Sequence, residues 1–272
     1  MCLALLGVDI HPSYRFLFAG NRDELYARPA APADFWLDAP QVLAGRDEEA
    51  GGTWLGITRQ GRFALVTNIR EPGGPRSGAP SRGGIAAEFL RGLDAPQDFA
   101  RRVAARGGRY NGFNLVVGDP GRLVYLSNRA EGPVFLAPGL YGLSNALLDA
   151  PWPKVLKAER LVELALALEG RALEERLFSI LADREVFPDA ALPATGLPLE
   201  AERALSPIFA ATPRYGTRCS TVILMDRHGA VLFAERTFDR SPEAWTEARY
   251  AFDLERETEE GSRPTRGTPP QP

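Results

Sequence analysis

The residue best suited to covalent chemistry is Cys2, which directly follows the first methionine. Cysteine is small enough that a methionine before it is normally trimmed, which leaves Cys2 with a free α-amino group. With an ordinary pKa of about 7.7–8.0, that amine can accept the thiol proton near neutral pH. Cys2 is therefore a candidate nucleophile that carries its own base. The alternative is a small apolar residue at the start of a buried strand.

A second group of reactive side chains follows an apolar run and comprises Asn21, Arg22, Asp23 and Glu24. Residues 3–9 and 14–20 are predicted to form two buried strands of a hairpin, so the end of the second lies near the start of the first. There Asp23 could orient an α-ammonium group, Asn21 could donate to an oxyanion, and Arg22 could hold a carboxylate or phosphate. The alternative is a solvated turn.

Histidine and cysteine are too scarce for several common catalytic and metal-binding sites. The two histidines, His11 and His228, each lie beside a turn former between apolar runs, so we expect exposed hairpin connections. A nucleophilic enzyme of this sequence is therefore expected to use a base other than histidine. Two cysteines are too few for a disulfide framework or a structural zinc site, and Cys219 is expected to be structural. No metal is expected.

Composition and charge indicate an ordinary globular protein. The 272 residues are 44% hydrophobic and 25% charged, which allows a sizeable core. No run approaches the roughly 18 apolar residues of a membrane span, and the first nine residues lack a secretory signal's basic leader, so we expect a cytoplasmic location. The net charge of −3 makes nucleic acid an unexpected partner. The strong preference for arginine over lysine indicates either anion binding or a GC-rich genome.

The elements that position these residues are mainly hairpins followed by helical pairs. Strands are predicted at residues 3–9, 14–20, 41–44, 54–58, 63–68, 113–119, 122–128, 141–146, 219–226 and 230–238. Helices are predicted at residues 85–93, 97–107, 152–168 and 173–183. The rest of 26–52 is interpreted as an irregular loop, and 71–84 as a flexible one. This order predicts an α+β fold of two largely antiparallel sheets enclosed by two helical layers.

The chain also resembles a known family, the NRDE family, which is also called the transport and Golgi organisation family. The matching segments are Met1-Cys2, Asn21-Arg22-Asp23-Glu24, GGTWLGI (51–57), VTNIRE (66–71), SRG (81–83), YNGFNLVVGD (110–119), LSNALLDAPWPKV (143–155) and GTRCSTVIL (216–224). They occur in order over about 225 residues, so the resemblance is more specific than any one motif. We therefore expect a single domain over residues 1–254 and a disordered tail over residues 255–272.

The family is similar to the N-terminal nucleophile hydrolases, especially the cysteine branch that includes bile-salt hydrolase, penicillin V acylase and acid ceramidase. This similarity implies a four-layer αββα sandwich in which Cys2 attacks an amide or thioester carbonyl. It also implies that Asp23 holds the α-amino group, that Asn68 contributes to the oxyanion hole and that Asn145, a second asparagine near the nucleophile, also assists the oxyanion. Arg218, close to the cysteine, would stabilise a thiolate.

One departure from the hydrolase branch concerns the substrate side of the site. That branch has an arginine immediately before its Asn-x-Asp pattern, whereas Gly20 stands here and Arg22 lies inside the pattern. We therefore expect Arg22 to point in a different direction. The substrate-binding residues predicted for this chain are Asn21, Arg22, Glu24, Arg70 and Arg82. Trp36 and Trp54 are further candidates to line a pocket, Trp152 is expected to pack at a helix start, and Asn111 and Asn114 are expected to be turn residues.

Three functions remain open from the sequence. The first is a hydrolase or acyltransferase with Cys2 as nucleophile and no required cofactor. The second, implied by the resemblance, is a binding or carrier protein for haem or for acyl-CoA and lipid, in which the phosphates would contact Arg22, Arg70, Arg82 and Arg218. The third is a vestigial pocket in a protein that acts through partners. The acyl group, the leaving group and the oligomeric state are not fixed by the sequence.

Overall fold

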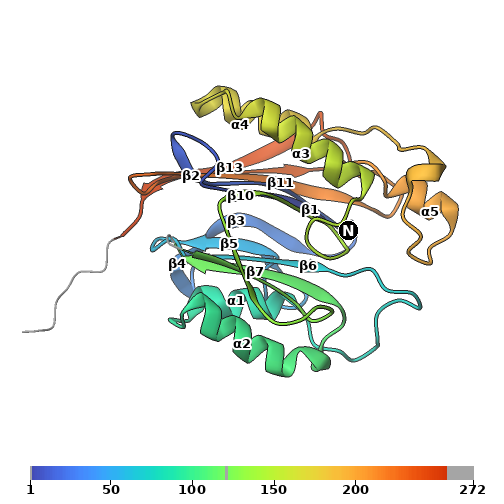
Figure 1. The fold of residues 1–272 in the computed structure, drawn as a ribbon, viewed down its shortest axis with the longest axis horizontal. Helices are drawn as coiled ribbons and strands as arrows, with labels where there is room; N and C mark the ends of the chain where they lie inside the picture. The colour runs from blue at the N-terminus through green and yellow to red at the C-terminus, as the bar shows by residue number, and fades with distance from the viewer. Residues whose placement is uncertain (1, 120–121, 256–272) are drawn as a thin grey trace, which may run out of the picture.

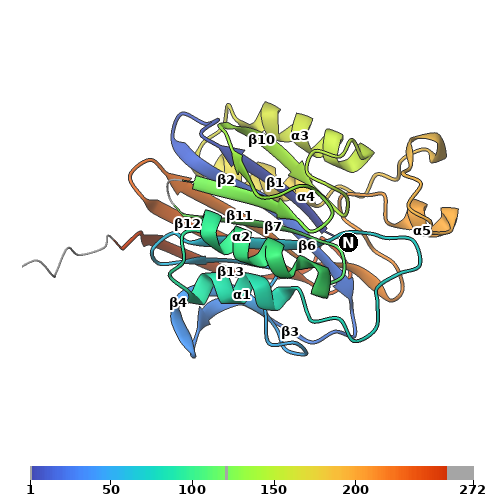
Figure 2. The ribbon, with the colours of Figure 1, turned by 60° about the horizontal axis from the view of Figure 1, so that its bottom comes forward.

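Two antiparallel sheets stack face to face in the computed structural model, which describes residues 2–119 and 122–255 (Figure 1). The first sheet has the order β10-β1-β2-β11-β12-β13 and the second the order β3-β4-β5-β6-β7-β8-β9. Helices α3 and α4 cover the outer face of the first sheet, and α1 and α2 cover that of the second (Figures 1 and 2). The predicted αββα architecture is confirmed.

The bounds of the elements are as follows. The first sheet contains β1 (Cys2–Val8), β2 (Tyr14–Leu25), β10 (Gly139–Leu143), β11 (Tyr215–Asp226), β12 (Ala230–Phe238) and β13 (Trp245–Asp253). The second contains β3 (Ala30–Trp36), β4 (Ala39–Asp47), β5 (Leu55–Thr58), β6 (Phe63–Asn68), β7 (Phe113–Asp119), β8 (Arg122–Ser127) and β9 (Val134–Leu136). The helices are α1 (Gly83–Arg91), α2 (Pro96–Arg106), α3 (Pro153–Ala165), α4 (Gly170–Leu181) and α5 (Leu199–Ala204), with 3₁₀ turns at Gly107–Arg109 and Asp189–Ala191.

Alternation along β1 divides its side chains between two cores. Leu3 and Leu5 pack with the helical layer of α3 and α4, whereas Ala4 and Leu6 face the second sheet. By the same alternation Cys2 faces the space between the sheets. The sequence of the first strand therefore decides that its cysteine points into the sandwich and not toward the helices.

The strands that the sequence did not predict, β3, β9 and β13, lie at sheet edges. β3 falls in the segment interpreted as a loop, and its alanines and Pro32 give it no apolar run. An edge strand tolerates proline because one row of its backbone groups needs no partner strand. β13 alternates half-buried and exposed residues and follows the last predicted strand. Of the predicted tail, Glu255 bonds through its backbone N–H to the Arg59 carbonyl, and residues 256–272 lie outside the described residues.

His11 corrects another expectation, because its side chain is only 2% exposed. Its Nδ1 accepts hydrogen bonds from the backbone N–H groups of Ser13 and Tyr14, and Nε2 lies 3.0 Å from the Leu168 carbonyl oxygen. These bonds join the β1–β2 turn to the helical layer, which explains why the His11 ring is buried. This turn lies at the far end of β1 from Cys2.

No helix of the described residues is long and apolar enough to cross a membrane.

Candidate functional site

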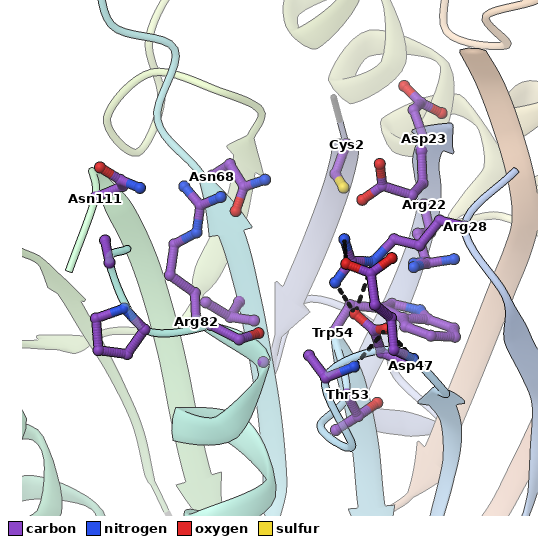
Figure 3. Close-up of a pocket in the computed structure, with 18 residues that line it drawn as sticks. Cys2, Arg22, Asp23, Arg28, Asp47, Thr53, Trp54, Asn68, Arg82 and Asn111 are labelled. Atoms are coloured by element: carbon purple, nitrogen blue, oxygen red, sulfur yellow. Dashed lines mark hydrogen bonds and ion pairs between the residues drawn. The ribbon is translucent and has the colours of Figure 1, made fainter. Parts of the chain in front are cut away.

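A cavity of about 340 Å³ opens where β1 begins, between the two sheets (Figure 3). Six of the ten side chains predicted for the site line it: Cys2, Arg22, Asp23, Glu24, Asn68 and Arg82. Trp54 and Asn111 line it as well. Cys2 and Arg22 lie on one side of the cavity, and Asn68 and Arg82 lie on the other.

Strand pairing brings the polar cluster of β2 to the cysteine. The cluster does not follow the strand, as the sequence suggested, but lies within it, because β2 continues to Leu25. Arg22 is the direct cross-strand partner of Cys2, and directly opposed residues in an antiparallel pair share a face. Arg22 therefore faces the space between the sheets with Cys2, while Asp23 points away from Arg22 (Figure 3).

The backbone nitrogen of Cys2 is held by Asn145, which belongs to the loop after β10. The Cys2 N–H donates to Asn145 Oδ1 at 3.0 Å, and Asn145 Nδ2 donates to the Asn68 carbonyl oxygen at 2.6 Å. Ser144 Oγ donates to the Cys2 carbonyl oxygen at 2.7 Å. These bonds fix the first residue of β1 against the end of β6. Removal of the first methionine would convert the nitrogen that Asn145 holds into an α-amino group.

Burial dominates the electrostatics around Cys2. It raises the pKa of the Cys2 thiol, while the positive charges of the amino terminus and of Arg22 lower that pKa in part. Burial also raises the pKa of Asp23, opposed by the amino terminus, by Lys154 and by a hydrogen bond of 2.7 Å from Thr217 Oγ1. A proton acceptor close to the thiol is therefore needed to form the thiolate near neutral pH.

Lys154 is a residue of this site that the sequence analysis missed. It lies in the first turn of α3, is 2% exposed, and donates from Nζ to the carbonyl oxygens of Leu205 and Pro207 at 3.2 and 3.4 Å. Burial lowers its pKa to about 8, although Asp23 and Cys2 favour the charged form. One signal was available, since Lys154 and Lys157 are the only lysines in the chain.

Four predicted site residues do not line the cavity. Asn21 was expected at the substrate, but its amide donates to the carbonyl oxygens of Leu181 and Ile208, both at 2.9 Å, and its side chain fastens β2 to the helical layer. Asn145 contacts the Cys2 nitrogen from behind, as described above. Arg70 and Arg218 make their contacts elsewhere.

The contacts of Arg70 and Arg218 explain their positions. Arg70 pairs with Glu202 at 2.5 Å, and its guanidinium lies 5.1 Å from the centre of the Trp152 ring. Arg218 lies at a β-bulge of β11, so it drops out of register with β2. Its guanidinium donates to the carbonyl oxygens of Leu25 and Arg28 at 2.9 and 2.8 Å. Neither guanidinium reaches the cavity in this arrangement.

Steric crowding explains why position 20 is a glycine. A Cβ atom there would lie 2.6 Å from Phe18 Cζ and 2.9 Å from the Leu3 carbonyl oxygen, so no larger residue fits. Positions 20 and 22 are two residues apart in one continuous strand and share a face. The expectation that Arg22 points in a different direction from a residue at position 20 is therefore wrong.

Cys219 is 4% exposed, and burial raises the pKa of its thiol well above the ordinary value. It pairs across the strands with Arg22, on the side opposite Cys2. Its thiol lies among buried groups and does not line the cavity, as expected for a structural cysteine.

Comparison with known proteins identifies the family. The family model described as Transport and Golgi organisation 2 matches residues 1–240, and the chain belongs to this family. The Transport and Golgi organization protein 2 homolog of Bos taurus is 41% identical over 278 residues, which cover 94% of this chain and 100% of the relative. The Homo sapiens homolog is 36% identical over the same shares. The Drosophila melanogaster protein is 30% identical, covering 87% of this chain and 92% of its own.

Solved structures show only distant similarity. A variant of conjugated bile acid hydrolase from Clostridium perfringens has a TM-score of 0.49 and 9% identity, with 93% of this chain and 92% of that chain covered. The Caenorhabditis elegans N-acylethanolamine-hydrolyzing acid amidase ortholog has a TM-score of 0.39 and 13% identity, with 82% of this chain and 92% of that chain covered.

Proposed function

We propose that this protein is an N-terminal cysteine nucleophile hydrolase or acyltransferase that acts on an amide or thioester bond. One observation supports the proposal: Asn145 Oδ1 accepts a hydrogen bond from the backbone nitrogen of Cys2 at 3.0 Å, and the same cysteine lines the cavity. The group that would serve as base is thus fixed before any substrate binds. Asp23, buried in the next strand, supplies the negative charge that an ammonium group needs.

The proposed reaction begins when the α-amino group of Cys2 takes the thiol proton. The thiolate then attacks the substrate carbonyl, and a C–S bond forms while the carbonyl oxygen becomes an oxyanion. The ammonium returns its proton to the leaving group as the C–N or C–S bond breaks, which leaves an acyl-enzyme. Water or an amine then attacks the thioester, gives its proton to the α-amino group and releases the acyl product with the thiol restored.

The two asparagines have different parts in this mechanism. Asn68 lies across the cavity from Cys2, and its exposed side chain is free to donate to the oxyanion (Figure 3). The amide of Asn145 is engaged at both ends, by the Cys2 nitrogen and by the Asn68 carbonyl oxygen. We therefore assign Asn145 to positioning the base and Asn68 to the oxyanion.

The test is the intact mass of the purified protein before and after incubation with acyl-CoA thioesters and N-acyl amides of several chain lengths. We expect loss of one methionine and an acyl adduct that peptide mapping assigns to Cys2. Cys2→Ala should abolish the adduct, and Cys219→Ala is the matched control that should retain it. A retained first methionine, or an adduct unaffected by Cys2→Ala, would refute the mechanism.

A binding or carrier function is the second candidate, favoured by the arginines of the cavity. Arg22 and Arg82 line it and are available to anions, so a phosphate- or carboxylate-bearing ligand could be held without chemistry. For haem, Cys2 is the one described lining residue of a type that commonly ligates the iron. A carrier of anions should keep its affinity in Cys2→Ala, whereas a hydrolase should lose turnover in that variant.

A further inference from the structure

Arg22 is buried, yet its guanidinium has no ionic or hydrogen-bonding partner among the described residues. It is 6% exposed, and no described carboxylate oxygen lies within 4.0 Å of its nitrogen atoms. Its contact is the face of the Trp54 ring, 4.1 Å from the ring centre. A guanidinium carries five N–H donors, and burying them without acceptors is costly. Because Arg22 lines the cavity, these donors are available to a ligand.

Arg82 presents a second guanidinium from the opposite side of the cavity (Figure 3). It precedes α1 and donates one hydrogen bond, from Nη1 to the Gly112 carbonyl oxygen at 3.1 Å. Burial lowers the pKa of Arg82, and no described carboxylate oxygen lies within 4.0 Å of its nitrogens. Two arginines, one from β2 and one from the loop before α1, thus line one cavity, and no ion pair among the described residues neutralises either charge.

The other charged side chains of the cavity limit the charge of the ligand. Arg28 is engaged by Asp47 at 2.8 Å and by Glu49 at 3.1 Å. Burial raises the pKa of Asp23, and the positive charge of the amino terminus opposes that rise. Glu24 also lines the cavity, and its Oε1 accepts the Leu25 N–H. Its charge favours the charged form of Arg82, and the buried Glu235 interacts with the charge of Arg22. The four acids that line the cavity, Asp23, Glu24, Asp47 and Glu49, offset its three arginines and the amino-terminal charge, so a ligand of low charge is favoured over a polyphosphate.

We infer that the substrate carries a carboxylate, which binds between Arg22 and Arg82 while the scissile carbonyl meets the Cys2 thiol. Arg22 and Cys2 are directly opposed across β1 and β2, so their Cβ atoms lie about 5 Å apart. A short N-acyl amino acid, whose carboxylate lies a few bonds from its scissile carbonyl, is the substrate class that this arrangement favours. The Trp54 ring lies under the Arg22 guanidinium on the same side of the cavity. This inference rests on the proposed function for its reacting bond.

The test compares two alkylating reagents of equal size, iodoacetate and iodoacetamide. In both reactions the Cys2 thiolate attacks the methylene carbon, a C–S bond forms, and the C–I bond breaks to release iodide. Only iodoacetate carries a carboxylate. We expect the iodoacetate-to-iodoacetamide rate ratio at Cys2 to exceed that of glutathione by about tenfold or more, since hydrogen bonds between charged groups are strong.

Variants assign the effect to the two arginines. Arg22→Gln and Arg82→Gln should each return the ratio toward that of glutathione, and Arg22→Lys should keep part of the preference. Arg46→Gln is the matched control, because Arg46 also lies over a tryptophan ring, Trp36 at 4.7 Å, but outside the cavity. A wild-type ratio equal to that of glutathione, or one unchanged in both glutamine variants, would overturn the inference.

A second experiment tests carboxylate binding without relying on the reactivity of the Cys2 thiol. In Cys2→Ala, calorimetry should detect binding of N-acetylglycine but not of the neutral N-acetylglycinamide, and Arg22→Gln should abolish that binding. Equal affinity for the two compounds, or no binding of either, would overturn the inference even where Cys2 resists both alkylating reagents. The proposed function and this inference can fail separately. A preference for carboxylates without an acyl adduct at Cys2 would indicate a carrier. Acyl adducts that form equally well from neutral substrates would refute only the inference that the substrate carries a carboxylate.

Discussion

At the scale of single residues, three buried ionisable groups lie near the start of β1, and the protonation state of each depends on the others. Cys2, Asp23 and Lys154 all shift toward their neutral forms because burial penalises charge. Asp23 and Lys154 lower that penalty for each other, since opposite charges favour the ionised forms. Lys154 is thus a positioning residue in the proposed mechanism, because it supports the carboxylate that faces the amine.

Lys154 also gives the protein a measurable pH dependence. Its pKa falls from 10.5 to about 8 on folding, so between these values the unfolded chain binds more protons and stability rises with pH. Between pH 7 and 9.5 this group alone should add about 2 kcal/mol to the free energy of unfolding. We expect Lys154→Met to remove that rise, as measured by urea unfolding across the pH range.

Lys157→Met is the matched control for this prediction. Lys157 is partly exposed and pairs with Asp183 at 2.5 Å and Glu185 at 2.6 Å, and these partners raise its pKa. Its contribution to stability is therefore lost only as the pH rises beyond its ordinary pKa, above the window examined. The stability difference between wild type and Lys157→Met should stay flat from pH 7 to 9.5. Parallel curves for wild type and Lys154→Met would contradict the lowered pKa of Lys154.

At the scale of elements, the loop of residues 69–82 between β6 and α1 borders the cavity. Its last residues, 79–82, line the cavity, and Gly73, Gly74 and Gly78 adopt positive φ angles that suit glycine. Asn111 fastens the loop through both backbone groups of Arg76: Oδ1 accepts the Arg76 N–H at 2.8 Å, and Nδ2 donates to the Arg76 carbonyl oxygen at 3.2 Å. Asn111 therefore fastens the middle of this loop, together with the Arg76 guanidinium, which donates to the carbonyl oxygens of Gly108 and Tyr110.

Asn111→Ala should release this loop without unfolding the protein. We expect faster amide hydrogen exchange over residues 73–79 and faster alkylation of Cys2 by neutral iodoacetamide, because the loop that borders the cavity becomes more mobile. The lost pair of hydrogen bonds should cost about 1–3 kcal/mol of stability. Exchange in β7 serves as the internal control and should change little. Unaltered exchange over residues 73–79 would show that Asn111 does not hold the loop.

Sequence pattern predicted these elements best where burial is strongest. The central strands and the helix α3 have apolar periods that admit one interpretation, and their bounds differ by a few residues from those predicted. The edge strand β3 has no such period, because its pairing and not its composition makes it a strand. At the site, pairing of β1 with β2 was predictable from the hairpin. The bulge at Arg218 and the contact of Lys154 with the loop before β11 were not, because both depend on tertiary contacts.

At the scale of the whole molecule, the inner faces of the two sheets serve two purposes along their length. Away from the cavity they close around aromatic side chains: the Phe63 ring lies 5.0 Å from that of Phe16 and 5.7 Å from that of Phe18. At the start of β1 they separate around Cys2 and Arg22. Since the apolar contacts and the polar cavity occupy different stretches of the same interface, stability and reactivity should respond to different substitutions.

Phe63→Ala tests this separation. Phe63 is 2% exposed and packs in the core shared by both sheets, so its truncation should lower the free energy of unfolding by about 3–5 kcal/mol, measured by urea denaturation. Under conditions where the variant is fully folded, the iodoacetate-to-iodoacetamide ratio at Cys2 should match that of wild type. Arg22→Gln should show the reverse, with the ratio lost and stability kept or raised, because no buried ion pair is broken. A Phe63→Ala protein that is folded but has lost the carboxylate preference would mean that the sheet spacing set by the core also sets the geometry of the two arginines.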